Sequence, residues 1–472
     1  MTLIILLPIF SLLLPTVHTT YECPSSLTIN SSGYVFPNDW KWSTDPAPSY
    51  DTVLDCSWTF NIPKGSFAQL LVTAATPAQG SITVKNCVGD REIVPSTASK
   101  EPYYFLTPQF TVHLLVSNNV SGTFGFTVKM SEFPSTQPSL FKVTNSPLIL
   151  TNVNTVLLTS ENRVSLIASS ASDPTNNSNL RMFAIFDGSD TTAPFMANMR
   201  QIVSSRNQLI SSGQNLTIVN LVPGTTIGNL IVVQDFSNVQ HFNQYKLADC
   251  SNKEMCSIGL DARDGMAAVV SVSLEDRYIS NIELTSVVAT LGVYYGANYT
   301  GALEDVPQKF NNHMTTIALN QGSALLEYTT QKVANWNKSY LNRKGFFASQ
   351  NFGIPSSNQD VSEMLNGKEE FSYGIQIYDN GLIGNATLQI YTYDTAGRTI
   401  SSQLYNANIL PSVNKMTFQC ASISFDYMTN GEITTGFNMN FEIQKNNFFD
   451  SSANSQVTFF TVLSSIVLMF IF

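Results

Sequence analysis

Short runs in which apolar and polar residues alternate recur along almost the whole chain. Clear examples lie at residues 69–73, 110–116, 123–128, 163–168 and 388–393. Such alternation places every second side chain on one face, which is typical of a half-buried β-strand. Turn-forming pairs separate the runs, among them Asp187-Gly188, Pro223-Gly224, Asp264-Gly265, Asn380-Gly381 and Asn430-Gly431. Many short strands joined by such turns predict an all-β, multidomain protein built of β-sandwiches.

Few segments predict a helix. The best is 194–209, because Pro194 suits a first helical position, and 361–365 could make a short turn. A stretch rich in Pro and Ser at 132–147 indicates a linker, or a strand that leads into the next domain.

Composition narrows the class of protein. Only 12% of residues are charged while 43% are hydrophobic, which excludes a disordered chain. The net charge of −10 opposes nucleic-acid binding, since that needs basic patches to release counterions. The length between the two apolar ends is enough for roughly two to four domains.

Both ends resemble processing signals. Residues 1–19 hold an apolar run too short to span a bilayer, followed by small and polar residues, which predicts a cleaved signal peptide rather than a signal anchor. At 447–472, small residues and a polar spacer precede an apolar tail with no basic residue after it. This pattern predicts a glycosylphosphatidylinositol anchor at Asp450, Ser451 or Ser452, with a tail-anchored helix as the alternative.

Sequons and cysteines agree with passage through the secretory pathway. Seven Asn-x-Ser/Thr sites are candidates for N-glycosylation: Asn30, Asn119, Asn176, Asn215, Asn298, Asn337 and Asn385. The even number of cysteines favours disulfides over zinc, because no Cys-x-x-Cys or His pair accompanies them. We expect Cys250 with Cys256 and Cys23 with Cys56, which leaves Cys87 and Cys420 to pair across domains or remain free.

The segment 55–65, with Cys56, Trp58 and Gly65, resembles the Cys-x-Trp core motif of CUB domains. The stretch 121–128 is similar to the closing Gly-Phe strand of that family, and 102–111 resembles most closely its divergent nematode CUB-like group. The resemblance implies a CUB-like domain at 20–131, a central β-rich domain at 148–343 and a degenerate second CUB-like domain at 344–446. Two CUB-like β-sandwiches would then flank the central domain, with few helices.

No arrangement of residues predicts catalysis. The chain lacks a His-Glu-x-x-His helix, a nucleophile elbow and a phosphate loop. His113 is expected at a half-exposed strand position, and Glu369 and Glu370 in a solvated loop. Many CUB domains bind calcium, but the acidic residues here do not match that pattern, so we expect no catalytic residue, metal or cofactor.

Runs of aromatic residues are the candidate interaction surfaces, although at strand ends such runs more often belong to the core. They lie at 103–105, 294–295, 346–347 and 448–449. We therefore expect a non-enzymatic, GPI-anchored cell-surface glycoprotein that binds an extracellular protein or glycan or forms a barrier, with an adhesion or receptor-like protein for one defined partner as the alternative. The family resemblance implies a role in innate defence or stress response.

Overall fold

The computed structural model describes residues 24–145, 147–273, 275–284, 291–295, 298–302, 308–310, 314–333, 336–352 and 355–445. The chain divides into two compact units, one formed mainly by the residues up to Ser135 and one by those from Thr136 onward. No helix in these ranges is long and apolar enough to cross a membrane. The predicted signal peptide and anchor sites lie outside the described residues.

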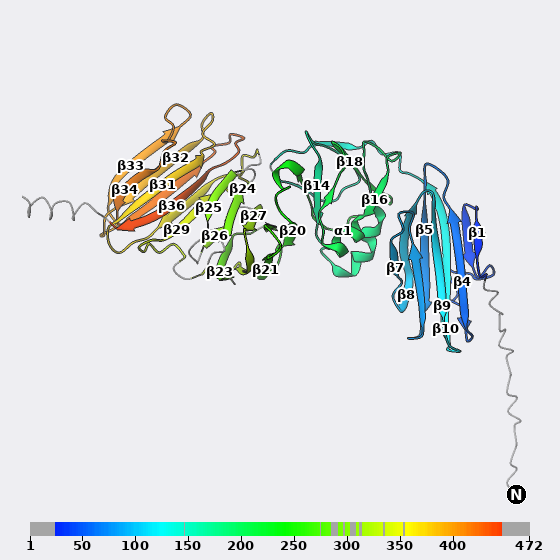
Figure 1. Cartoon of the computed structure of the whole chain (residues 1–472). Coiled ribbons are helices and arrows are strands. Elements are labelled where there is room, and N and C mark those ends of the chain that lie inside the picture. The colour runs from blue at the N-terminus through cyan, green and yellow to red at the C-terminus, as the bar shows by residue number, and fades with distance from the viewer. Residues whose placement is uncertain are drawn as a thin grey trace, which may run out of the picture. The chain divides into compact units, whose positions relative to one another are not determined.

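The first sandwich is drawn in blue to cyan in Figure 1. Its two sheets have the orders β1-β4-β9-β6-β7 and β2-β10-β5-β8, with β3 beside β10. Its strands are β1 (Leu27–Ile29), β2 (Gly33–Phe36), β3 (Ser49–Tyr50), β4 (Leu54–Asn61), β5 (Ser66–Ala75), β6 (Gly80–Lys85), β7 (Arg91–Ile93), β8 (Thr97–Leu106), β9 (Gln109–Val116) and β10 (Gly122–Glu132). Cys56, Trp58 and Phe60 alternate along β4 with more exposed residues and point into the core. There the Trp58 ring lies 5.1 Å from that of Phe126 in the opposite sheet, so aromatic packing holds the two sheets together.

The second sandwich has sheets with the orders β11-β13-β18-β15-β16 and β12-β19-β14-β17. Its elements are β11 (Ser139–Lys142), β12 (Leu148–Leu150), β13 (Thr155–Thr159), β14 (Val164–Ala168), η1 (Pro174–Met182), β15 (Phe183–Phe186), β16 (Phe195–Asn198), α1 (Met199–Ser205), β17 (Leu209–Ile210), β18 (Asn215–Asn220), β19 (Ile231–Asp235) and η2 (Phe236–Asn238). Fully buried aliphatic residues line both sheets, for example Leu158 and Leu216 on one and Leu166 and Val233 on the other.

The third sandwich has the orders β20-β22-β27-β24-β25 and β21-β28-β23-β26. Its strands are β20 (Gln244–Asp249), β21 (Met255–Ala262), β22 (Ala267–Val272), β23 (Arg277–Leu284), β24 (Leu291–Tyr295), β25 (Asn298–Ala302), β26 (Gln308–Phe310), β27 (Met314–Leu319) and β28 (Gly322–Thr329). Ile258 and Leu326 from one sheet pack with Val269 and Ile317 from the other in a single apolar core.

The fourth sandwich has the orders β29-β36-β31-β34 and β30-β35-β32-β33. Its strands are β29 (Lys344–Ala348), β30 (Val361–Leu365), β31 (Phe371–Asp379), β32 (Thr387–Tyr393), β33 (Thr399–Asn406), β34 (Met416–Cys420), β35 (Ser422–Met428) and β36 (Asn438–Lys445). Tyr373 and Ile375 of one sheet share a buried core with Leu388 and Ile390 of the other.

The described residues repeat one strand order in all four sandwiches. When the strands of each sandwich are numbered in chain order and β3 is left out, the first three have sheets 1-3-8-5-6 and 2-9-4-7. The fourth has 2-9-4-7 and 3-8-5-6 when β29 is counted as strand 2. Strand 1 runs parallel to strand 3 in the first three, and a parallel bridge between Lys338 and Asn366 takes the same place in the fourth. The protein is therefore a tandem array of one sandwich topology.

This repetition differs from the organisation that the sequence suggested. The range 148–343, predicted as one central β-rich domain, holds strands of two separate sheet pairs. Within 132–147, predicted as a linker or a strand lead-in, Ser139–Lys142 forms β11, the first strand of the second sandwich. The predicted strands at 69–73, 110–116, 123–128, 163–168 and 388–393 are confirmed as parts of β5, β9, β10, β14 and β32, except that β14 begins one residue later, at Val164.

Both helical expectations were wrong in detail. The segment 361–365 is strand β30, with Val361, Glu363 and Leu365 buried. The helix expected at 194–209 spans only Met199–Ser205, and Pro194 precedes β16 instead of opening a helix. Asn198 starts the helix because its side chain accepts a hydrogen bond from the Gln201 amide, while the Gln201 side chain accepts one from the Asn198 amide.

The second and third sandwiches pack against each other within one compact unit. Every residue of β19 and of β22 is buried, because each strand has its own core on one face and the neighbouring sandwich on the other. Val232 of β19 shares an apolar cluster with Ala268 and Val270 of β22. The buried Tyr245 hydroxyl adds a 2.7 Å hydrogen bond to Gln234 across the same junction.

Candidate functional site

The structure places the predicted cysteines in different chemical states. Cys250 and Cys256 form the expected disulfide. Cys56 is disulfide-bonded, and Cys23, its predicted partner, lies outside the described residues. Cys87 and Cys420 are free. Of the two possibilities left open for them, pairing across domains or remaining unpaired, the structure therefore shows the second. Burial raises the pKa of the Cys420 thiol to about 12, so this thiol is protonated at neutral pH and unreactive.

The described sequon residues have different exposures. Asn30, Asn119 and Asn385 are exposed, whereas Asn176, Asn215 and Asn337 are partly buried. Asn298 opens strand β25, and its side chain is not among those described. Exposed asparagines are the better acceptors for a bulky glycan, so the first three are the strongest candidates.

Most of the aromatic runs considered as interaction surfaces belong to the core where the structure describes them. Tyr103, Phe105, Phe346 and Phe347 are buried, while 448–449 lies outside the described residues. His113 is at a half-exposed strand position, 2.8 Å from the Asp55 carboxylate. Glu369 and Glu370 are exposed. Among the described residues, no group of acidic, His or Cys side chains could hold a metal ion.

The main cavity candidate is a cleft of about 1060 Å³ where the second and third sandwiches meet. Its floor is continuous with the apolar junction between them, through the half-buried side chains of Ile149, Leu230 and Leu247. Its exposed rim is instead made of hydroxyl, amide and basic side chains from the loops around residues 170–172, 206–207 and 251–253. A partly apolar cleft with convergent polar groups is the usual form of a small-ligand site.

A glycine shapes one wall of this cleft. Gly228 has a φ of +63°, and a Cβ atom at this position would lie 2.3 Å from the Ser172 hydroxyl oxygen. The backbone conformation therefore favours glycine, and its absence of a side chain leaves room for the Ser172 hydroxyl at the rim.

Three basic residues face the cleft. Arg206 adopts the left-handed conformation that ends α1, while Lys246 lies on β20 and Lys253 on the disulfide loop. The Lys246 ammonium donates to the Gln244 side chain at 2.8 Å, and that of Lys253 donates to the Asp249 backbone carbonyl at 2.7 Å.

None of these three cations forms an ion pair with a carboxylate among the described residues. Asp249 lines the cleft, but its carboxylate accepts a hydrogen bond from the Ser251 amide. Asp261 is near enough for Lys246 to help lower its pKa, although hydrogen bonds from Arg263 are the main cause. The cleft therefore carries more positive than negative charge in a chain whose net charge is −10.

The loop that carries Lys253 is held from two sides. The Cys250–Cys256 disulfide closes it, and Cys256 itself lines the cleft. The buried guanidinium of Arg277 donates to the Cys250 carbonyl oxygen and, at 2.8 Å, to the Ser273 hydroxyl. These contacts fix the rim residues Ser251 to Lys253 without occupying their side chains.

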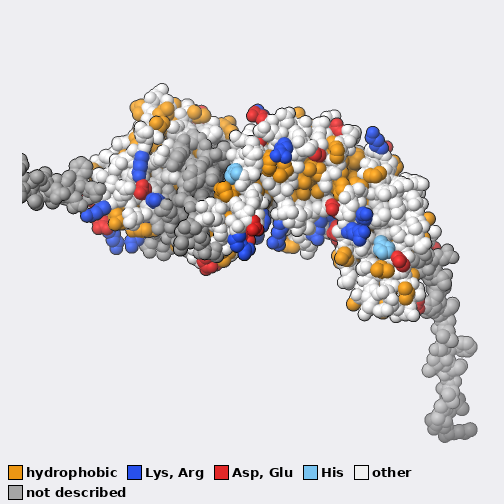
Figure 2. Space-filling model, in the orientation of Figure 1, with side chains coloured by type: hydrophobic (Ala, Val, Ile, Leu, Met, Phe, Trp, Pro, Cys, Tyr) orange, Lys and Arg blue, Asp and Glu red, His pale blue; other side chains and the backbone are white. Residues whose placement is uncertain are grey.

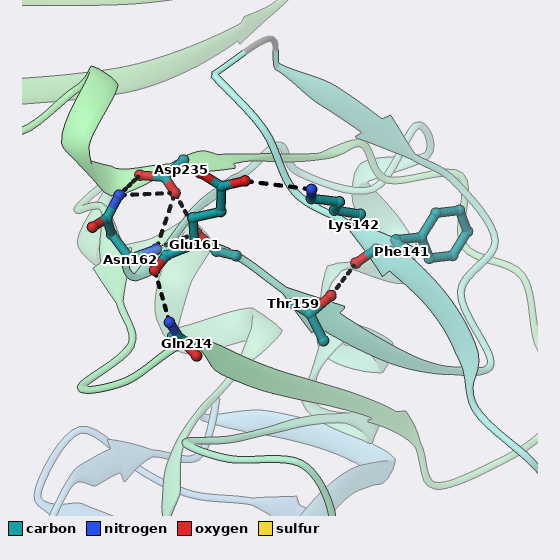
Figure 3. A network of polar contacts seen from close by, with 8 residues as sticks. Phe141, Lys142, Thr159, Glu161, Asn162, Gln214 and Asp235 are labelled. Carbon is teal, nitrogen blue, oxygen red and sulfur yellow. Dashed lines mark hydrogen bonds and ion pairs between the residues drawn. The ribbon is translucent and has the colours of Figure 1, made fainter.

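A second polar cluster has a structural role. In Figure 3 the Asp235 carboxylate lies against the turn between β13 and β14, where it accepts hydrogen bonds from the backbone and side-chain nitrogens of Asn162. Ser160 and Ser237 hydroxyls donate to it at 2.5 and 2.6 Å. Burial by itself would raise the pKa of Asp235, but these hydrogen bonds outweigh it and lower the pKa to about 2. Through these hydrogen bonds from neutral donors, the Asp235 carboxylate stabilises the turn between β13 and β14.

Two family models match parts of the chain. The model described as a CUB-like domain matches residues 18–134, and a domain of unknown function, DUF7592, matches residues 136–221. The first match confirms the resemblance inferred from the motif around Cys56 and Trp58. No curated protein matches the chain.

Solved structures show only distant similarity. The CUB1-EGF-CUB2 domains of rat MASP-1 are 12% identical, with 44% of this chain and 99% of that chain covered and a TM-score of 0.18. The full extracellular region of zebrafish Gpr126/Adgrg6 is 11% identical, with 90% and 53% covered and a TM-score of 0.19. Similarity at this level carries no information on function. The amino-terminal sandwich of this all-β, multidomain protein is thus the part that matches the CUB-like domain family.

Proposed function

We propose that the protein is a non-enzymatic binding glycoprotein, displayed on the outer face of the plasma membrane by a glycosylphosphatidylinositol anchor. The observation that carries this proposal is the CUB-like match at 18–134 together with the repetition of that sandwich's strand order through residue 445. CUB-like domains are typical of extracellular proteins that bind partners. The Cys250–Cys256 disulfide also favours an oxidising compartment.

The low density of charged side chains on the surface agrees with a binding protein exposed on the outside of the cell. In Figure 2, Lys, Arg, Asp and Glu side chains are scattered over a largely uncharged face. The cleft between the second and third sandwiches favours a defined extracellular ligand over a purely barrier-forming role. Innate defence or stress response is the physiological setting that the family resemblance implies.

Anchoring can be tested on intact cells that express the full chain. Phosphatidylinositol-specific phospholipase C should release the protein into the medium, because the enzyme cleaves the lipid and leaves the ectodomain intact. A variant in which Asp450, Ser451 and Ser452 are replaced by bulky residues should lose the anchor and fail to appear in the released fraction. Retention of the wild type, while a known lipid-anchored marker is released, would contradict the anchor.

The absence of enzymatic activity needs a separate test. The released ectodomain is incubated with peptide and glycan libraries, and the products are measured by mass spectrometry. We expect binding without turnover. Turnover that depends on the intact protein would overturn the proposal.

A further inference from the structure

We propose that the cleft between the second and third sandwiches binds an anionic oligosaccharide, one whose sugars carry carboxylate or sulfate groups. This inference rests on the proposed extracellular binding role and names the class of ligand for it.

The first argument is charge. Arg206, Lys246 and Lys253 face one cleft of about 1060 Å³, and none forms an ion pair among the described residues. Asp249 lines the cleft and Asp261 lies near Lys246, so the three basic side chains outnumber the acids described there. An anionic ligand supplies the missing negative charge and gains charge-assisted hydrogen bonds, which are about twice as strong as neutral ones.

The second argument is the chemistry of the exposed rim. Besides the basic residues, the accessible lining carries the hydroxyls of Thr151, Ser170 and Ser172 and the amides of Asn207 and Asn252. Such groups both donate and accept hydrogen bonds, which matches the many hydroxyls of a sugar chain. Because these hydroxyl and amide groups lie around the basic residues, the rim favours an anionic sugar over an acidic peptide.

The third argument is preorganisation. The Cys250–Cys256 disulfide and Arg277 hold the loop of Lys253, and the close approach of Gly228 to Ser172 shapes the opposite wall. A rim fixed before binding loses less conformational entropy when the ligand arrives.

The test uses the soluble ectodomain and isothermal titration calorimetry with three defined probes. These are a heparin-derived hexasaccharide, which is sulfated and carboxylated, a hyaluronan hexasaccharide, which is only carboxylated, and neutral maltohexaose. We expect saturable binding of at least one anionic probe, weaker binding as the salt concentration rises, and none of maltohexaose. Each of Arg206→Ala, Lys246→Ala and Lys253→Ala should weaken binding roughly three- to tenfold, and the triple variant should abolish it.

A matched triple variant controls for net charge. Lys332, Lys338 and Lys368 are exposed residues outside the cleft, so Lys332→Ala/Lys338→Ala/Lys368→Ala removes the same charge and should leave binding within about twofold. Thermal melting of both triple variants verifies that they are folded. Equal losses in the two triple variants, binding of neither anionic probe, or binding of a poly-glutamate peptide in place of the sugars would overturn the proposal. In each case phospholipase C would still release the protein from cells. Failure of the oligosaccharide proposal is therefore distinguishable from failure of the proposed function.

Discussion

The buried carboxylate of Asp235 is stabilised by neutral hydrogen-bond donors instead of by an opposite charge. Its carboxylate is almost fully buried, and hydrogen bonds from Ser160, Asn162 and Ser237 stabilise the ionised form. The folded-state pKa of about 2 lies below the ordinary value of 3.8 for an aspartate side chain. The group therefore contributes stability above about pH 4, and this contribution is lost as the pH falls from about 4 toward 2.

Asp235→Asn should destabilise the second sandwich by about 2 kcal/mol at pH 7. This is the free energy that corresponds to the lowering of the Asp235 pKa on folding. The difference from wild type should shrink when the pH is lowered to about 2.5, because the wild-type carboxyl loses its advantage there. Calorimetric melting of the full ectodomain at both pH values measures this. The exposed Asp190, which caps a turn in the same sandwich through Thr192, supplies the control Asp190→Asn. An Asp235→Asn effect of the same size at both pH values would contradict the assignment.

At the scale of elements, an ion pair between Lys309 and the buried Glu363 joins β26 and β30. The Lys309 ammonium lies 2.8 Å from Asp276 and 2.6 Å from Glu363, whose side chain is only 7% exposed. Burial by itself would lower the pKa of Lys309, but the two carboxylates outweigh it and raise the pKa. The same ammonium lies 5.5 Å from the centre of the Trp336 ring, so the third and fourth sandwiches share this contact.

Lys309→Met should lower the free energy of unfolding by about 3–5 kcal/mol, because the buried Glu363 loses its compensating charge. The double variant Lys309→Met/Glu363→Leu should recover a substantial part of that loss, since both charges are then removed. Urea unfolding measures each variant. Lys415→Met is the control, because its pair with Glu442 is 44% and 31% exposed and should contribute less than about 1 kcal/mol. An equal effect of the two single variants would contradict the role of burial.

The short disulfide loop supports the rim of the cleft. Cys250→Ala/Cys256→Ala should cost about 2 kcal/mol, since even a short closed loop restricts the unfolded chain. We expect a reducing agent to lower the melting temperature of the wild type more than that of the double variant, in which only the disulfide at Cys56 remains to be reduced. Cys87→Ser is the control, because Cys87 is free and half-buried. A loss of stability in Cys87→Ser as large as in the double variant would count against this explanation.

At the scale of the whole molecule, the first sandwich closes its own hydrophobic core, from Ile29 to Val128. A secreted fragment of residues 20–135 should therefore fold alone, with one cooperative thermal transition and a near-ultraviolet circular dichroism signal from packed aromatics. Trp58→Ala should destabilise it by about 3–5 kcal/mol, because Trp58 is completely buried. A fragment that shows no cooperative transition would contradict the independence of this sandwich.

The alternation of apolar and polar residues predicted individual strands well where one face is covered. β4 and β32 alternate strictly between buried and more exposed residues. The same method fails for β19 and β22, in which every residue is buried. A continuous apolar run does not reveal which second surface covers it. The packing between sandwiches was for that reason invisible in the sequence.

Local sequence was sufficient for the all-β class, the five strands predicted by alternation, the Cys250–Cys256 loop and the CUB-like character of the first sandwich, because each depends on neighbouring residues. The repeated strand order and the cleft required the tertiary structure. Strand order depends on hydrogen bonds between distant segments, such as β2 with β10 or β29 with β36, which different sequences can form equally well. Arg206, Lys246 and Lys253 meet at one cleft only because two sandwiches pack together, and no pattern along the chain encodes that contact.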